Sequence, residues 1–415
     1  MALAFSATPI IRCSVFALLC ILLYTLRPCQ SFLIPTPKPF RTIPATTLTA
    51  TRTTMSSIQT EPTNANSKTN HVDSMDNDLT LVHWLLDATH GKTPGSGYEI
   101  KLWRRWSVLT ITCIRNELER TLPTAVDSAA TERLEFDLGV AADRGEMPSF
   151  TDAGSRSGYS LIHFGRSVRA ATVLRNEGIL ERIRPSHSRL GPCPQTKPIR
   201  VCSIGGGPGY DHVAVALAAT YHGFGAIHTL VLDYEPGWED VVYTMHNATN
   251  TVLRSNHGCS FGLCDITESI VSATNQQHLL DAVRETDIFV CQYCVAENDK
   301  KLEQSNHVFF RELVEKMRPE AVLLLTETTH RSWPGIYDAI ENIHCEVVFP
   351  LNRGRQMLVR KLQTTDENET NIPTKRRESK QNEDFIRQFR ESIIANGRKQ
   401  QRGIGRQRRK VRGAK

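Results

Sequence analysis

The sequence predicts an α/β fold with a mainly parallel sheet, and three observations carry this prediction. Five short apolar runs alternate between residues 200 and 327 with segments long enough to form crossover helices. Two further runs near residue 350 are separated by only three residues, which is a hairpin connection. A cluster of glycines directly follows the first run, at the end of a strand where such sheets bind their ligands.

Seven segments are rich in the residues that favour strands. The first five are expected to pair in parallel. The last two, joined by residues 352–354, are expected to form a hairpin, so that one strand at that edge of the sheet is antiparallel. The strand candidates are RVCSI (200–204), AIHTLVLD (226–233), CSFGLCD (259–265), DIFVCQY (287–293), AVLLLTE (321–327), EVVFPL (346–351) and RQMLVRKL (355–362).

A helical region is expected before the sheet, over residues 78–190. Leu79, Val82 and Leu85 form a helical stripe in this region, and a second stretch with helical spacing ends at Pro123. Residues 59–77 are polar and aperiodic, and they predict a disordered linker. The α/β domain is placed at residues 196–362.

The first 58 residues have the character of a targeting presequence. Residues 1–60 hold five basic residues and no acid, and the apolar run from Cys13 to Leu26 is shorter than the about 20 residues of a membrane span. A signal peptide followed by a Phe32-led, Thr-rich stretch resembles the bipartite plastid presequences of algae with secondary red plastids. We therefore expect a plastid location and no stable membrane association of the mature protein. The alternatives are secretion, a membrane anchor, and initiation at Met55, which would leave the protein in the nucleus, nucleolus or cytosol.

The charge of the chain is concentrated at its C-terminal end. The formal net charge is +6, but residues 375–415 carry 15 Lys and Arg against 4 Asp and Glu, a charge of +11, so the rest carries −5. Residues 363–415 are predicted to be a basic, partly helical tail, with a helix over 382–397 that has apolar residues on one face. A basic tail on an acidic body favours a polyanionic partner, and the alternative is a solvated, disordered tail.

The cysteines do not suggest a disulfide framework or a metal site. Cys202, Cys264 and Cys291 lie in apolar runs and are expected to be buried free thiols. Cys291 and Cys294 form a CxxC pair, but no second pair accompanies it. We therefore expect no bound metal.

The glycine cluster, VCSIGGGPGYD (201–211), lies between a predicted strand and a predicted helix. Glycines in this position permit a tight turn and let a ligand approach backbone N–H groups. The spacing of Gly205, Gly207 and Gly209 lacks the third glycine of the dinucleotide-binding motif at its usual place. The loop therefore predicts a ligand site, but alone it does not identify the ligand.

Acidic residues end the next three strand regions in order. Asp233 lies 24 residues beyond Gly209, where a carboxylate can bind both ribose hydroxyls of a nucleoside, and Glu235 is a nearby alternative. Asp265 is placed to bind an adenine amino group, with Ile266 packing on the ring. The fourth strand ends in QYCVAEN (292–298), which brings Glu297 to the same edge.

In sequence order, these features resemble the motifs of class I S-adenosylmethionine-dependent methyltransferases over residues 200–362. The resemblance implies a Rossmann-like seven-stranded fold with a C-terminal antiparallel hairpin, and S-adenosylmethionine as the cofactor. The resemblance also implies that Ser203, Gly205, Gly207 and Gly209 contact the cofactor. The family usually has an acid where this chain has Ser203, so Asp211 or the loop carbonyls would have to bind the methionine ammonium. Tyr159, His163 and Arg166 lie in a helix that often covers the cofactor in this family, and His330, Arg331 and Trp333 follow strand five.

A finer resemblance is to the eukaryotic and fungal group of large-subunit rRNA uridine-N3 methyltransferase-like proteins. Glu297 matches the glutamate of that group's fourth-strand element and Glu327 matches the acid that ends strand five, although Ala296 replaces an Asn. The resemblance implies Glu297 as a catalytic base and Tyr293 as a stacking or orienting side chain. The alternatives are that Glu297 caps the following helix and that Tyr293 packs in the core.

Three functions remain open from the sequence. The first is an RNA methyltransferase, favouring a base nitrogen of rRNA, whose tail 375–415 binds phosphates. The second is a small-molecule methyltransferase. The third is an inactive methyltransferase-like protein that binds RNA, an alternative raised by Ser203. The chain lacks the NPPY or DPPY motif of adenine and cytosine amine methylation and the cysteine motif of carbon-5 methylation.

Overall fold

The computed structural model describes residues 69–88, 96–144, 146, 149–183, 197–327, 333–351 and 355–363, together with Arg387 and Glu391. The chain divides into the units Met1–His71 and Val72–Lys415. Of the described residues, only 69–71, at the start of helix α2 (Thr69–Asp87), belong to the first unit. The predicted presequence 1–58, linker residues up to 68, His330 and Arg331 lie outside the described residues. So does the predicted tail beyond residue 363, apart from Arg387 and Glu391.

The second unit is built on one seven-stranded sheet with the order β3-β2-β1-β4-β5-β7-β6. β1 to β5 pair in parallel, whereas β7 is antiparallel to both of its neighbours, β5 and β6. This confirms the predicted Rossmann-like α/β fold with its C-terminal hairpin. The strands are β1 (Ile199–Ile204), β2 (Ile227–Asp233), β3 (Gly258–Leu263), β4 (Ile288–Gln292), β5 (Val322–Thr326), β6 (Cys345–Leu351) and β7 (Gln356–Lys361).

The central strands are mainly apolar because helices cover both faces of the sheet. Every residue of β4 and of β5 is buried. The direction of the strand order reverses between β1 and β4, so the loops that follow these two strands diverge and leave a crevice at the carboxyl edge. That crevice is where the functional site lies.

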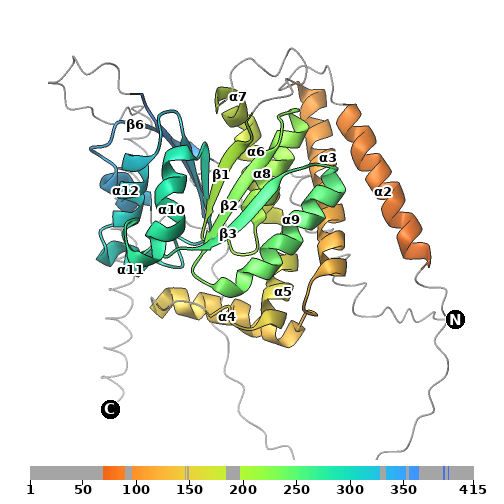
Figure 1. Ribbon diagram of the computed structural model, residues 1–415, viewed down its shortest axis with the longest axis horizontal. Helices are drawn as coiled ribbons and strands as arrows, with labels where there is room; N and C mark the ends of the chain where they lie inside the picture. Colours follow the sequence, from red (N-terminus) through yellow and green to blue (C-terminus); the bar gives the residue numbers. More distant parts are fainter. Residues whose placement is uncertain are drawn as a thin grey trace, which may run out of the picture. The chain divides into compact units, whose positions relative to one another are not determined.

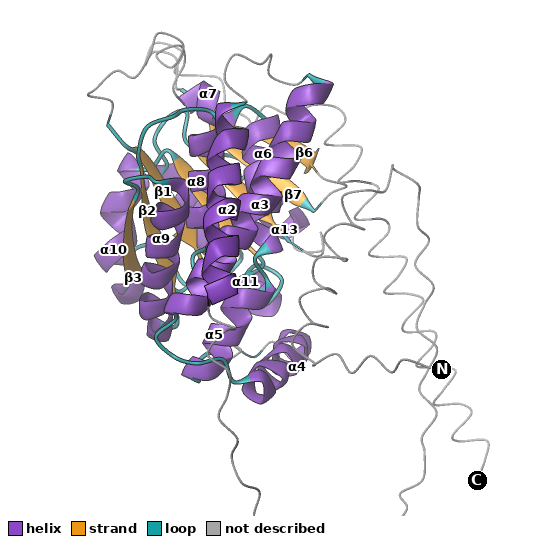
Figure 2. Ribbon diagram, turned by 90° about the vertical axis from the view of Figure 1, so that its right-hand side faces the viewer, coloured by secondary structure: helices purple, strands orange, loops and turns teal. Residues whose placement is uncertain are grey.

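Two layers of helices enclose the sheet (Figures 1 and 2). Helices α3, α6, α8 and α9 belong to one layer and share one hydrophobic cluster with the sheet. Helices α10, α12 and α13 belong to the other layer and share a second cluster with it. The helices are α2 (Thr69–Asp87), α3 (Gly97–Thr121), α4 (Ser128–Arg144), α5 (Ala153–Ile162), α6 (Gly165–Asn176), α7 (Ile179–Ile183), α8 (Tyr210–Tyr221), η3 (Pro236–Trp238), α9 (Glu239–Leu253), α10 (Ala273–Glu285), α11 (Asp299–Gln304), α12 (Val308–Lys316) and α13 (Trp333–Ala339). Among the helices that the structure describes, none combines the length and apolar character that a membrane crossing requires.

The helical region before the sheet packs into the same core as the sheet. Trp103 and Trp106 of α3 contact Tyr221 at the end of α8, with ring centroids 4.8 Å and 5.2 Å apart. Beside them, the buried Arg175 of α6 forms an ion pair with the buried Glu99 of α3. The N-terminal helices are therefore part of the structure that supports the sheet.

One predicted boundary is wrong. The segment 59–77 was expected to be a disordered linker, but α2 begins at Thr69 and takes in its last residues. The apolar stripe that includes the buried Val82 and Leu85 anchors this helix to the core. Once such a stripe fixes part of a helix, adding polar turns at its N-terminal end costs little, because helix propagation is much easier than nucleation.

Contact between α4 and α5 depends on a glycine. A Cβ atom at Gly158 would lie 2.9 Å from the Cβ of the buried Thr131 on α4, closer than two such atoms can approach. We predict that Gly158→Ala lowers the free energy of unfolding by about 1–3 kcal/mol, as overpacking does, although alanine favours helix more than glycine. Gly165→Ala in α6 is the control, because nothing lies within 4 Å of its added methyl.

Denaturant unfolding of the two variants measures the difference. The control should stay within about 0.5 kcal/mol of the parent, as surface substitutions usually do. Equal stability of the two variants would mean that α4 and α5 do not pack through Gly158.

Candidate active site

The glycine loop between β1 and α8 forms the floor of the site. Gly205, Gly207 and Gly209 have φ angles of 59°, 47° and 92°, the left-handed region that favours glycine. A Cβ on Gly205 would also lie 2.6 Å from the Cys294 sulfur. The loop is held to β2, since Gly206 N donates to the carbonyl of Leu232 at 3.0 Å. Bare backbone is needed here because the loop packs directly against its neighbours.

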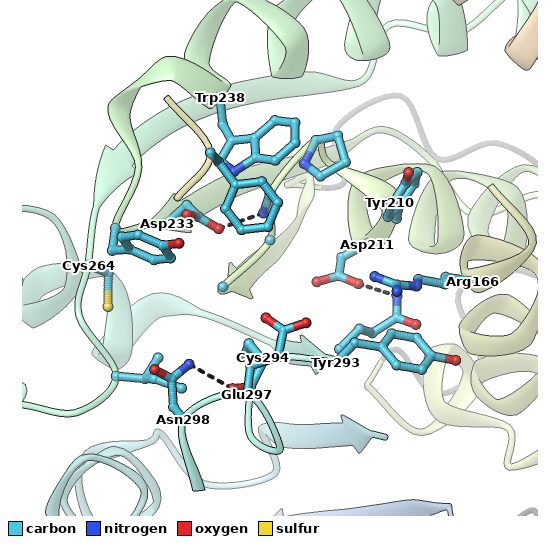
Figure 3. Close-up of a pocket in the computed structure, with 18 of the residues that line it drawn as sticks. Arg166, Tyr210, Asp211, Asp233, Trp238, Cys264, Tyr293, Cys294, Glu297 and Asn298 are labelled. Carbon is cyan, nitrogen blue, oxygen red and sulfur yellow. Dashed lines mark hydrogen bonds between the residues drawn. The ribbon is translucent and has the colours of Figure 1, made fainter. Parts of the chain in front are cut away.

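A pocket of about 690 Å³ opens above this loop at the carboxyl edge of the sheet. Four acids line it, one from the region after each of the first four strands: Asp211, Asp233, Asp265 and Glu297. Arg166 is the one cationic side chain of the described lining. Figure 3 shows the carboxylates of Asp211, Asp233 and Glu297 directed toward a common space. The pocket is therefore strongly acidic.

Asp211, in the first turn of α8, belongs to a buried hydrogen-bond network that borders the pocket. Ser203 Oγ donates to Asp211 Oδ2 at 2.6 Å, and Gln292 Nε2 donates to Asp211 Oδ1. Burial raises the pKa of Asp211 to about 6, although both hydrogen bonds lower it. An acid is thus present at the loop even though Ser203 replaces the expected one.

Ser203 and Gly209 were predicted to contact the cofactor, but neither lines the pocket. Ser203, which is fully buried in β1, donates to Asp211, so it orients the acid rather than the ligand. Gly209 is the N-cap of α8 and faces Met245 and Val242 of α9. Both residues shape the loop from the side away from the pocket.

Asp233 ends β2 and binds the loop directly. Its Oδ2 accepts from Gly207 N at 2.8 Å, and its Oδ1 accepts from Glu235 N at 3.1 Å. Burial raises its pKa to about 6, against the lowering effect of these bonds. Glu235, the alternative acid, does not line the pocket, because its carboxylate accepts from Gly237 N at the start of η3.

Asp265 and Ile266 lie together beyond β3 on the pocket wall. Asp265 Oδ1 accepts from both the backbone N and the hydroxyl of Thr267, at 2.8 Å and 2.7 Å. Asn275 of α10 holds the backbone of the same residue through Asp265 N and O. The carboxylate is therefore fixed in place before any ligand binds.

Glu297 lies on the turn after β4, opposite Asp233. Burial raises its pKa to about 7, with Arg166 opposing this shift and Asp233 adding to it. Asn298, not Glu297, is the N-cap of the following α11. The turn itself is held by the buried Glu327 at the end of β5, whose Oε1 accepts from Val295 N and Ala296 N at 2.7 Å and 3.2 Å. Glu327 therefore positions the turn and does not enter the pocket.

Tyr293 lines the pocket in a strained backbone conformation, with φ at 62°. The Arg166 guanidinium lies 4.2 Å from the centre of its ring, and Arg169 Nη1 donates to its hydroxyl at 2.8 Å. Although burial lowers the pKa of Arg166, Tyr159, Tyr210 and Glu297 raise it overall, so Arg166 stays charged. Left-handed backbone at a bulky residue is uncommon and concentrates at functional sites.

An aromatic wall that the sequence did not predict completes the pocket. Phe150, Tyr234 and Trp238 line it beside Tyr159, and the Phe150 ring lies 5.2 Å from that of Trp238 and 5.5 Å from that of Tyr159. Of the helix candidates noted in the sequence, Tyr159 and Arg166 line the pocket. His163 instead faces Glu135 at 3.2 Å, and Trp333 is fully buried in the other helix layer.

Two polar atoms of the lining have no hydrogen-bond partner among the described residues. Gln292 Oε1 and Asn298 Oδ1 are buried, and both belong to side chains whose amide nitrogens are already bonded. A buried acceptor without a partner is costly, so both atoms indicate where a ligand would place hydrogen-bond donors. The site thus offers carboxylates and amide oxygens, which suit a ligand that is cationic or rich in donors.

Comparison with known proteins adds general likeness only. No protein-family model and no curated protein matches the chain. Among solved structures, a putative O-methyltransferase from Klebsiella pneumoniae is 12% identical, with a TM-score of 0.29 and coverage of 63% of this chain and 100% of that one.

Two further structures have similarly low scores. A SAM-dependent methyltransferase from Methanosarcina mazei is 10% identical, with a TM-score of 0.29 and coverage of 41% and 95% of the two chains. A SAM-dependent O-methyltransferase from Thermotoga maritima is 9% identical, with a TM-score of 0.26. The match covers 41% of this chain and 62% of the Thermotoga protein. The function is therefore inferred from the site.

Proposed function

We propose that this protein is an S-adenosylmethionine-dependent methyltransferase. The observation that carries the proposal is the set of four carboxylates facing one arginine in a single pocket on the glycine loop. A dinucleotide or nucleoside triphosphate would bring phosphates into this field and be repelled. S-adenosylmethionine instead brings a sulfonium, an ammonium, two ribose hydroxyls and an adenine amino group, which are cations or hydrogen-bond donors.

The lining residues fit each part of this cofactor. Asp233 is placed for the ribose hydroxyls, and Asp265 with Ile266 for the adenine ring and its amino group. Asp211 and the unpaired Gln292 Oε1 offer acceptors for the methionine ammonium. Arg166 offers the counter-charge for the methionine carboxylate. Asp211 supplies an acid at the loop, so the presence of Ser203 in place of the usual acid is not a reason to regard the protein as inactive.

The chain's own residues supply orientation and a base. The bound cofactor would provide an already activated methyl group, so most of the catalysis lies in positioning the nucleophile for in-line attack. A nitrogen nucleophile forms the N–CH₃ bond and gives up its proton, which Glu297 can accept as a carboxylate. Tyr293, fixed from two sides by Arg166 and Arg169, offers a ring on which a planar substrate can stack.

RNA is the proposed substrate, with a base nitrogen of rRNA favoured. The sequence supports this through the +11 charge of residues 375–415, which suits binding to phosphates. Arg169 of α6 also supports it, because it adds a positive charge beside the pocket, where it donates to the Tyr293 hydroxyl. A small-molecule substrate is the alternative, and it would make the basic tail unnecessary for activity.

Cofactor binding tests the assignment of Asp233. We predict that Asp233→Asn weakens S-adenosylmethionine binding by roughly 10- to 100-fold, the value of hydrogen bonds to a charged group. Glu235→Gln, which alters the neighbouring acid outside the pocket, should bind normally. Isothermal titration calorimetry measures both, and an equal loss in the two variants would refute the assignment of the ribose to Asp233.

The pH dependence of methyl transfer tests Glu297. A base must be deprotonated to act, and its pKa is raised to about 7 in the ligand-free pocket. We therefore predict that kcat/KM rises with pH through about 7 and levels off above it, and that Glu297→Gln lowers the plateau by roughly 10²- to 10⁴-fold and removes this limb. Glu303→Gln, on the exposed face of α11, is the control. An unchanged profile in Glu297→Gln would exclude it as the base.

Labelled methyl transfer into fractionated RNA, protein and metabolites tests the substrate. We predict incorporation into RNA by the intact chain. Deletion of residues 375–415 should reduce RNA affinity and flatten its dependence on salt while leaving cofactor affinity unchanged. Label that enters only the metabolite fraction, or a truncated chain with full RNA affinity, would contradict an RNA substrate.

A further inference from the structure

A second cluster of reactive side chains lies outside the cofactor pocket, where α8 and α9 pack on β3. His212 Nε2 of α8 lies 3.3 Å from His246 Nδ1 of α9. Cys259 of β3 joins them, so that the sulfur and one ring nitrogen of each histidine lie within 4.8 Å of one another. None of the three residues lines the pocket. The proposed methyl transfer therefore leaves this cluster without a role.

The separation of the two ring nitrogens fits a tetrahedral metal ion. Zinc binds histidine nitrogens at about 2.0–2.1 Å, so two such ligands at a tetrahedral angle lie about 3.3–3.4 Å apart. The sulfur has to approach by up to about 1 Å to reach its usual bonding distance of about 2.3 Å. Cys259 lies on β3, the edge strand of the sheet, which pairs on one side only and can make this adjustment.

The hydrogen bond of His212 favours the tautomer in which the Nε2 lone pair is directed at the cluster. Its Nδ1 lies 2.9 Å from the hydroxyl of the buried Thr229 on β2. When Nδ1 carries the ring proton and donates to that hydroxyl, Nε2 is left to accept, which is the usual way a metal-binding histidine is oriented.

His257 does not provide a fourth protein ligand. The ring of His257 lies 6.3 Å from that of His212, centre to centre. Its Nδ1 accepts from Ile227 N at 3.3 Å, and its Nε2 lies 3.4 Å from the Thr220 hydroxyl, so both nitrogens have partners elsewhere. Three protein ligands and one water complete the coordination.

We propose that His212, His246 and Cys259 bind a divalent transition-metal ion of the zinc type, which ties α8 and α9 to the edge strand β3. Two imidazoles and one thiolate, without a carboxylate, are the donors such ions prefer. In the metal-free chain the proton of His246 lies on Nδ1, between the two ring nitrogens, and His246 Nε2 faces the amide nitrogen of Asn250 at 3.3 Å. When the ion binds Nδ1, that proton moves to Nε2, the Asn250 amide turns away from it, and Cys259 releases its thiol proton to solvent.

Metal analysis of the untagged full chain tests this proposal. We expect purified protein to retain close to one zinc per chain after gel filtration, and Cys259→Ser and His246→Ala each to weaken Zn²⁺ binding by roughly 100-fold or more. Thr229→Val, which removes only the hydroxyl behind His212, should weaken it by roughly 10- to 100-fold. Cys345→Ser alters a buried thiol in β6 within the other hydrophobic cluster, and it should retain the metal.

Cobalt provides a spectroscopic readout of the sulfur ligand itself. Co²⁺ added to metal-free wild-type protein should give a thiolate-to-cobalt charge-transfer band and the intense visible bands of tetrahedral cobalt. Cys259→Ser should lose the charge-transfer band, and Cys345→Ser should keep it. A wild-type chain that holds no zinc and gives no such spectrum, or a Cys259→Ser variant with the wild-type spectrum, would overturn the proposal.

Discussion

The constraint on which the site depends is electrostatic: four carboxylates share one pocket with a single guanidinium. Burial raises the pKa of Asp211 and Asp233 to about 6 and that of Glu297 to about 7, which means that ionising them in the empty pocket is costly. A cationic ligand rich in hydrogen-bond donors offsets that cost, and an anionic one adds to it. The charge of the pocket therefore favours a cationic ligand over an anionic one.

The topology of the sheet brings these carboxylates together. Parallel strands end at one edge, so an acid after each of four strands reaches the same pocket although the sequence separates Asp211 from Glu297 by more than eighty residues. The glycine loop lets the chain turn within contact distance of Cys294, and Asp233 holds it there through Gly207 N. The same carboxylate thus shapes the loop and faces the ligand. The helices before the sheet add Tyr159 and Arg166, which close the pocket from the other side.

The sequence predicted the strands closely because each is a continuous apolar run, and it predicted the acids because they follow those runs directly. It could not predict contacts between distant segments. Gln292 reads as one more residue of β4, yet it bonds to Asp211. Phe150 lies in an irregular segment with no pattern of its own, yet it packs on Trp238. The same reason hides His212, His246 and Cys259, which have no ligand spacing in the sequence and meet only through packing. At Ser203 the sequence lacks the acid expected of the family. The structure shows that Ser203 is hydrogen-bonded to an acid eight residues later, Asp211.

Calorimetric titration of the full chain with S-adenosylmethionine and, separately, with NAD tests most directly whether the charge of the pocket selects the ligand. The two share adenosine and differ in the groups attached to it: a sulfonium, an ammonium and a carboxylate in one, a pyrophosphate and a nicotinamide riboside in the other. We expect saturable binding of S-adenosylmethionine and no measurable binding of NAD under the same conditions. Binding of NAD with equal or higher affinity, or the absence of heat with S-adenosylmethionine, would contradict it.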